Sequence, residues 1–177
     1  MNTLLNSLLD TMFIKRFCLP INTNIEKYEN GEINVSSCVC GHYNHIACVF
    51  QGKDRYFKEA RILSFGINIM GDSDGHEPGI HAEQNALLKL KPIKIKKKLE
   101  SIDLLVVRFS KTTKIQSSKP CNNCIKIMND IPPKKGYKIQ NIYYSDTDGN
   151  IVKTNLSKLM NIEQHYSRFY RKCRLFK

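Results

Sequence analysis

Two short motifs with metal-binding side chains constrain the fold of this chain more than any other feature. The first is His81-Ala82-Glu83, and the second is Pro120-Cys121-Asn122-Asn123-Cys124. Each motif opens a stretch with helical character, and a β-rich stretch separates them. The pattern therefore predicts two helices that begin with metal ligands, with a strand between them in the sequence.

The histidine and the two cysteines form a donor set that suits Zn²⁺. Zinc prefers nitrogen and sulfur ligands in a tetrahedron, and a site with three protein ligands keeps the fourth position for water. Cys121 and Cys124 are spaced i and i+3, so they project from one face of a helix's first turn. The helix N-terminus also favours thiolate over thiol. We expect Zn²⁺ to be bound by His81, Cys121 and Cys124.

Glu83 is the candidate catalytic residue. It follows His81 by two residues, which is about 200° around a regular helix, but the looser geometry of a first turn lets both side chains reach the same site. Zinc lowers the pKa of a bound water toward neutrality, and Glu83 can take a proton from that water and pass it on. The alternatives are a structural zinc site or a redox pair. A structural site would need a fourth protein ligand. The order of the two motifs, each at the start of a helix with a strand between them, also favours a catalytic zinc site.

The remaining pattern predicts an α/β fold, a three-layer α-β-α sandwich around a five-stranded mixed sheet. Short apolar or alternating runs predict strands, and an Asp148-Gly149 pair predicts a hairpin turn. The second helix is expected to stop before Pro132-Pro133. In chain order we expect strands at 45–50 and 61–70, a helix at 81–90, a strand at 101–109, a helix at 121–130, and strands at 138–145 and 150–154.

These motifs resemble the signature of the zinc-dependent cytidine and deoxycytidylate deaminase superfamily, over residues 45 to 160. The resemblance implies that the three ligands bind zinc, that Glu83 moves protons, and that a nucleobase loses its exocyclic amine as ammonia. It also implies two substrate contacts, the backbone amide of Ala82 and the side chain of Asn68. For Asn68 the alternative is a loop-capping role.

The hairpin turn distinguishes two branches of that superfamily. One branch inserts a helix after the fourth strand and adds a parallel fifth strand, as in tRNA adenosine deaminases, deoxycytidylate deaminases and antiviral DNA editors. The other folds straight back as an antiparallel hairpin, as in free cytidine deaminases. The segment Tyr143 to Asn150 leaves no room for a helix, so the resemblance implies the hairpin branch and a cytosine base that becomes uracil.

The charge of the chain leaves the form of the substrate open. The formal net charge is +12, and the basic residues concentrate at 89–98 and 153–177. One interpretation is a surface that binds the phosphates of a nucleotide or of single-stranded DNA or RNA. The other is composition, since the chain is rich in Lys, Ile and Asn, as AT-rich genomes favour. A zinc-containing nucleic-acid-binding protein without catalysis is a further alternative.

The organisation along the chain indicates one zinc deaminase domain at 41–160. We expect an N-terminal extension at 1–40 that packs on this domain and a basic C-terminal tail at 161–177. No run approaches the roughly 18 apolar residues of a membrane span, so no membrane partner is expected. The resemblance suggests a homo-oligomer, since related small deaminases build sites at subunit contacts.

The seven cysteines indicate an intracellular, reducing compartment, because their number is odd and no signal peptide is recognisable. Five of the Cys and His residues lie close together before and within the first expected strand: Cys38, Cys40, His42, His45 and Cys48. They could hold a second, structural metal ion. Their spacing is tighter than that of ordinary zinc sites, which favours core packing for His45 and Cys48.

Overall fold

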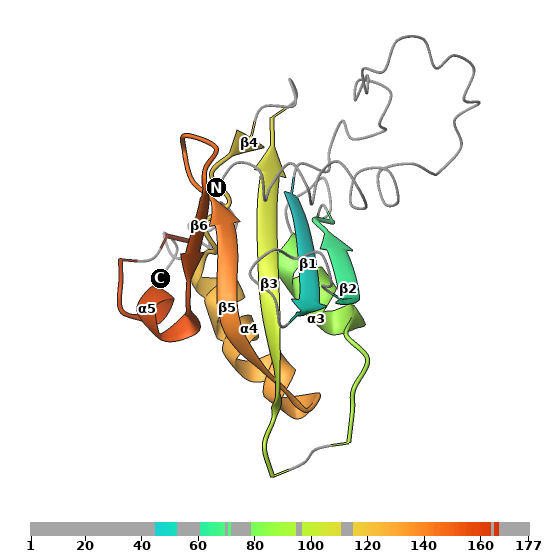
Figure 1. Ribbon diagram of the computed structural model, residues 1–177. Helices are drawn as coiled ribbons and strands as arrows, with labels where there is room; N and C mark the ends of the chain where they lie inside the picture. Colours follow the sequence, from blue (N-terminus) through green and yellow to red (C-terminus); the bar gives the residue numbers. More distant parts are fainter. Residues whose placement is uncertain are drawn as a thin grey trace, which may run out of the picture.

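The computed structural model describes residues 45–52, 61–69, 71, 79–94, 97–110, 115–163 and 165–166. These residues form one mixed sheet with helices against it (Figure 1). The elements are β1 (His45–Gln51), β2 (Arg61–Ile67), α3 (Ala82–Lys89), β3 (Glu100–Phe109), β4 (Ile115–Gln116), α4 (Asn122–Lys134), β5 (Tyr137–Ser145), β6 (Ile151–Thr154) and α5 (Leu156–Met160).

The strand order is β2-β1-β3-β5-β6, and the short β4 pairs with β3. Strand β1 is antiparallel to both of its neighbours, β3 and β5 are parallel, and β6 returns antiparallel to β5. Gly149, at φ +83°, lies in the turn between β5 and β6, where its missing Cβ permits a left-handed backbone. The expected α/β class, the mixed sheet and the Asp148-Gly149 hairpin are therefore confirmed.

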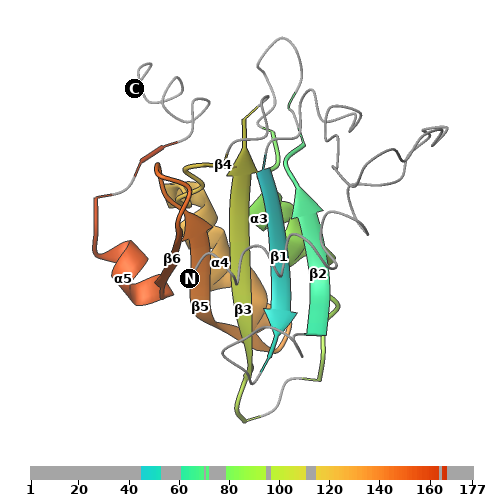
Figure 2. The ribbon, with the colours of Figure 1, turned by 45° about the horizontal axis from the view of Figure 1, so that its top comes forward.

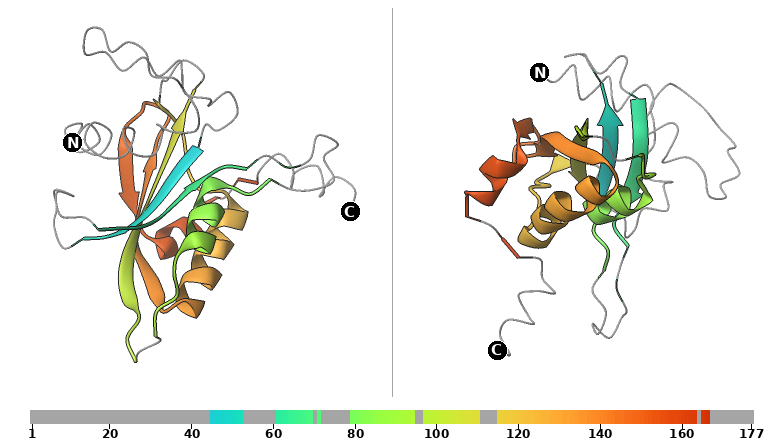
Figure 3. Two further views of the ribbon diagram at one scale, coloured as in Figure 1. Left: turned by 90° about the vertical axis from the view of Figure 1, so that its right-hand side faces the viewer. Right: turned by 90° about the horizontal axis from the view of Figure 1, so that it is seen from below.

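Helices α3 and α4 lie side by side on one face of the sheet (Figure 3). The small helix α5 lies at the β6 edge and contacts α4 and β5 (Figure 2). In the part of the chain that the structure describes, no helix lies on the opposite face. The described residues thus supply one of the two helix layers of the predicted sandwich, and the expected N-terminal extension lies outside them.

Two hydrophobic clusters, one on each face of the sheet, explain why β1 and β3 read as continuous apolar runs. Alternate side chains of a strand point to opposite faces. Ala47 and Val49 pack with Leu104 and Val106 on the helix side. Ile46, Cys48, Phe50, Leu105 and Val107 form the cluster on the other side.

Helix α4 extends four residues beyond its expected end and includes Pro132 and Pro133, so the expectation that it stops at residue 130 is wrong. Both prolines lie in the last turn and are followed in the helix only by Lys134, so the two hydrogen bonds that their missing N–H groups remove are lost at the end of the helix and not in its middle. The turn is closed by bonds from Lys135 N–H to Pro132 O (2.9 Å) and from Gly136 N–H to Pro133 O (3.1 Å). Strand β4 was also not expected, because only two residues of a polar stretch pair with β3.

No helix among the described residues has the length and apolar character needed to cross a bilayer.

Candidate metal centre

The three expected ligands come from the starts of the two helices. His81 and Cys121 are the N-cap residues of α3 and α4, and both have extended backbones, with ψ of 154° and 167°. His81 thus lies just before the helix, whereas Glu83 lies within it. The two side chains are therefore not forced about 200° apart, as they would be within a regular helix. Cys124 lies one turn into α4 and is fully buried.

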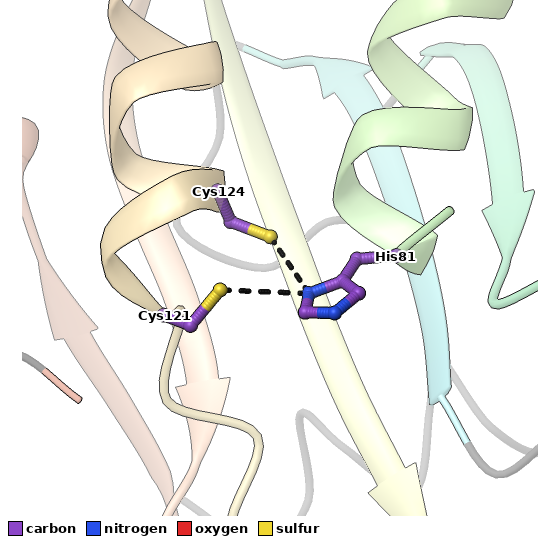
Figure 4. A group of neighbouring side chains, drawn as sticks. All are labelled: His81, Cys121 and Cys124. Atoms are coloured by element: carbon purple, nitrogen blue, oxygen red, sulfur yellow. Dashed lines mark hydrogen bonds between the residues drawn. The ribbon is translucent and has the colours of Figure 1, made fainter. Parts of the chain in front are cut away.

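The side chains converge on one point between the helices (Figure 4). Nδ1 of His81 lies 3.1 Å from Sγ of Cys124 and 3.5 Å from Sγ of Cys121. The three ligand atoms lie within 4.8 Å of one another, and no other such group occurs among the described residues. In a tetrahedral zinc site with Zn–N of about 2.0 Å and Zn–S of about 2.3 Å, the N···S edge is about 3.5 Å. The donor set and its spacing therefore fit Zn²⁺.

The two thiols have opposite protonation tendencies. A hydrogen bond from Cys124, with a further contribution from His81, lowers the pKa of Cys121 to about 4 against the effect of burial. The pKa of Cys124 is raised by its hydrogen bond to Cys121, by burial and by the nearby Glu83 carboxylate. The lowered pKa of Cys121 favours the thiolate, which is the form that ligates metals.

Glu83 lies beside the ligands with an unpartnered oxygen. Its side chain is 3% exposed, and its Oε2 atom is buried without a hydrogen-bond partner. Burial raises its pKa, while the His81 ring opposes the increase. A buried carboxyl group whose oxygen is unused by the protein is free for a ligand of the centre, and a raised pKa brings it closer to the range of a general acid and base.

Packing of α3 on β2 fixes the position of His81 and Glu83. Gly66 has no side chain at the contact, and a Cβ there would collide with the backbone of Ala82 and Ala86. Ser64 Oγ donates to Ala86 O (2.8 Å), and Asn85 Nδ2 donates to Ile67 O (2.7 Å). None of these three positioning residues was expected from the sequence, although a glycine within a strand is a signal of close backbone approach.

A buried hydroxyl pair fixes the segment that leads into Cys121. Ser118 Oγ donates to Val106 O (2.8 Å) and accepts from Ser145 N–H (2.8 Å). Ser118 N–H donates to Ser145 O (2.8 Å). The segment is thereby bonded to β3 and to the end of β5, which sets where α4 begins. No sequence signal distinguished these serines from ordinary loop residues.

The two expected substrate residues lie at the same edge of the sheet as the ligands. Ala82 is the first residue of α3 and is buried. Asn68 follows β2, where its Oδ1 accepts from His45 N–H (3.1 Å) and its N–H donates to His45 O (3.3 Å). The Asn68 side chain therefore joins the end of β2 to the start of β1, as in the loop-capping alternative. Substrate contact by Asn68 and Ala82 stays a prediction.

The members of the second Cys and His group that are described do not converge. Cys48 belongs to the cluster on the far face of the sheet, and burial raises its pKa to about 12. His45 occupies the opposite phase of β1 and lies near His81 and Cys121, whose charges affect its pKa. Core packing is confirmed for Cys48, whereas His45 borders the metal centre. Cys38, Cys40 and His42 lie outside the described residues.

No family model matches the sequence, and no curated protein matches it. Among solved structures, the chain is similar to a dCMP deaminase from the cyanophage S-TIM5 in its apo form. The identity is 21%, the match covers 54% of this chain and 77% of the other, and the TM-score is 0.27. A likeness of this extent has no bearing on function, which is argued below from the residues of the site.

Proposed function

We propose that this chain is a zinc-dependent hydrolytic deaminase that converts a cytosine base to uracil and releases ammonia. One observation carries the proposal: His81, Cys121 and Cys124 converge next to a buried carboxyl group, Glu83, that has an unpartnered oxygen. Three ligands with a proton-transferring group fit hydrolysis, whereas a structural site would use four protein ligands.

In the proposed mechanism, His81, Cys121 and Cys124 hold the metal, and Glu83 moves protons. Bound Zn²⁺ would supply a water ligand of near-neutral pKa. Glu83 accepts a proton from the attacking water and delivers protons to the ring nitrogen and to the departing amine. Its burial excludes bulk water from these transfers.

Cytosine is favoured over adenine by the hairpin. Strand β6 pairs antiparallel with β5 directly after a short turn, the arrangement that the superfamily resemblance associates with cytidine deaminases. A deaminase acting on single-stranded DNA or RNA, and a zinc-containing nucleic-acid-binding protein without catalysis, are the competing functions.

Glu83→Gln is expected to abolish ammonia release while leaving zinc content unchanged. The amide keeps the shape of the side chain but cannot accept the proton, so the rate should fall by a factor of about 10² to 10⁴. The measurement is ammonia release from cytidine, deoxycytidine, their monophosphates, single-stranded DNA and RNA, with zinc determined by metal analysis.

Asp130→Asn, a change of an exposed carboxylate on α4, is the matched control and should keep full activity. If the zinc-loaded wild-type protein releases no ammonia from any of these substrates, and Glu83→Gln binds nucleic acid as the wild type does, the non-catalytic function is correct instead.

A further inference from the structure

The described part of the lysine-rich stretch 89–98, residues 89–94 and 97–98, lies at the end of the sheet away from the metal centre, which is the wrong place to bind a substrate of that centre. The ligands lie at the starts of α3 and α4, whereas this stretch follows the end of α3. It is bonded next to the end of α4, through Ile93 N–H and Lys135 O (3.0 Å). Helix α4 has 13 residues and is therefore about 20 Å long. The length of α4 therefore separates these lysines from the metal centre.

A different basic residue, Arg108, lies at the end of the sheet where the metal ligands lie. Arg108 is directly opposite His45 in the β1–β3 ladder. Side chains two residues apart on a strand point to the same face of the sheet. Arg108 therefore points to the same face as Leu104 and Val106, which pack on the helix side. On β1, His45 likewise points to the same face as Ala47 and Val49, which also pack on the helix side. Arg108 and His45 therefore lie on the face that carries α3 and α4, at the edge where both helices begin. Ligands of α/β sheets commonly bind at such carboxyl ends of strands.

Arg108 and two residues of the metal centre, His81 and Cys121, all lie close enough to His45 to affect its pKa. Burial and the positive charges of Arg108 and His81 lower the pKa of His45 to about 4, while Cys121 opposes them. His45 and Arg108, directly opposite each other in the β1–β3 ladder, therefore form a pair beside the metal centre. Arg108 is exposed, and within the described residues no carboxylate forms an ion pair with it.

We propose that Arg108, with His45 beside it, binds a phosphate group of the substrate, so that the site selects a cytosine nucleotide over the free nucleoside. This inference rests on the proposed deaminase function. A guanidinium binds phosphate through paired hydrogen bonds, and the ring of His45, directly opposite Arg108 on the neighbouring strand, can add one more. The phosphate belongs either to a mononucleotide or to a nucleotide unit of a single strand.

Lys119 is the rival cation, since it lies two residues before Cys121. It lines a hollow of about 460 Å³ together with Ile162, Glu163 and His165. Its ammonium group donates to Glu163 O (3.3 Å), and the Glu163 carboxylate would repel a phosphate in that hollow. Arg108 is therefore the better phosphate-binding group.

The test compares deamination of deoxycytidine, deoxycytidine monophosphate and a single-stranded oligodeoxynucleotide by wild-type protein and variants. Arg108→Gln should raise KM for phosphorylated substrates about 10- to 100-fold and leave kcat/KM for deoxycytidine unchanged. Arg108→Lys should recover part of the loss, and His45→Gln should show a smaller selective loss. Lys138→Gln removes an exposed charge at the opposite end of the sheet, beside Ser101, and should change nothing.

Equal losses on all substrates, or no loss in Arg108→Gln, would overturn the proposal, as would selective loss in Lys119→Gln alone. A loss confined to the monophosphate identifies a mononucleotide substrate, and one confined to the oligonucleotide identifies a strand. If the wild type deaminates nothing, the proposed function fails independently. Equilibrium binding of deoxycytidine monophosphate to wild type and Arg108→Gln then still decides the phosphate site.

Discussion

Gly66 lies where β2 packs tightly against the backbone of α3, the helix whose start carries His81 and Glu83. A methyl group there would meet backbone atoms of α3, including Ala86 Cα at 2.9 Å. Backbone cannot move aside as a flexible side chain can, so the helix start that carries His81 and Glu83 must shift. The close contact explains why an unremarkable glycine in a strand constrains the catalytic geometry.

We predict that Gly66→Ala lowers the free energy of unfolding by about 1–3 kcal/mol or more and weakens zinc binding. Urea unfolding and zinc titration measure the two effects. Gly149→Ala, at φ +83°, is the control: strain in the left-handed region should cost about 1–2 kcal/mol without any loss of zinc affinity. Equal zinc affinity in both variants would contradict this role for Gly66.

His45 should make the protein less stable in acid. Its pKa is about 4 in the folded protein, against an ordinary 6.5, so between these values the unfolded chain binds the proton more readily. Stability is therefore lost as pH falls from about 6.5 toward 4. The contribution between pH 7 and pH 5 is about 2 kcal/mol.

Urea unfolding at the two pH values, for the wild type and His45→Gln, measures this contribution. Between pH 7 and pH 5, the free energy of unfolding of the variant should fall by about 2 kcal/mol less than that of the wild type. Identical losses would show that His45 does not carry the effect.

At the scale of elements, the sequence predicted the order and type of the main strands and helices, because their apolar periodicity and the Asp148-Gly149 turn are local signals. It predicted which three side chains converge, because His81, Cys121 and Cys124 belong to two recognisable motifs. It did not predict that His45 and Arg108 lie opposite each other beside the metal centre. Alternation along a strand shows which side chains share a face of the sheet, but it does not show which face carries the helices. Which residues lie opposite each other on neighbouring strands depends on the register, which the sequence pattern does not give.

Hydrogen bonds also connect the C-terminal ends of α3 and α4. Lys135, just beyond α4, donates from Nζ to Leu88 O (2.6 Å) and Leu90 O (2.7 Å) at the end of α3. A cation at a helix C-terminus satisfies carbonyl groups that have no helical partner and complements the helix dipole.

Lys135→Met should therefore lower the free energy of unfolding by about 1–3 kcal/mol, the value of hydrogen bonds from a charged donor. Lys138→Met, which changes an exposed lysine on β5, should cost less than about 0.5 kcal/mol. Thermal or urea unfolding compares the two. A Lys135→Met protein as stable as the Lys138→Met protein would show that these bonds add nothing.

For the molecule as a whole, a metal ion bound at the metal centre would cross-link the two helices that cover the sheet. His81 holds the start of α3, and Cys121 and Cys124 hold the start of α4. A metal bound by all three side chains favours the folded state, by about 4 kcal/mol when free zinc exceeds its dissociation constant 1,000-fold. Zinc removal should thus lower stability and abolish activity together.

Glu83→Gln separates these two effects. It leaves the three ligands in place, so a chelator should lower its unfolding midpoint as much as it lowers that of the wild type, although neither form of the variant is active. Cys124→Ser removes a ligand and should lose both the stabilisation and the activity. Re-addition of Zn²⁺ to the stripped wild-type protein should restore both. If stripping leaves the unfolding midpoint of the wild type unchanged, the helices are held by packing alone and the metal has no structural share in the fold.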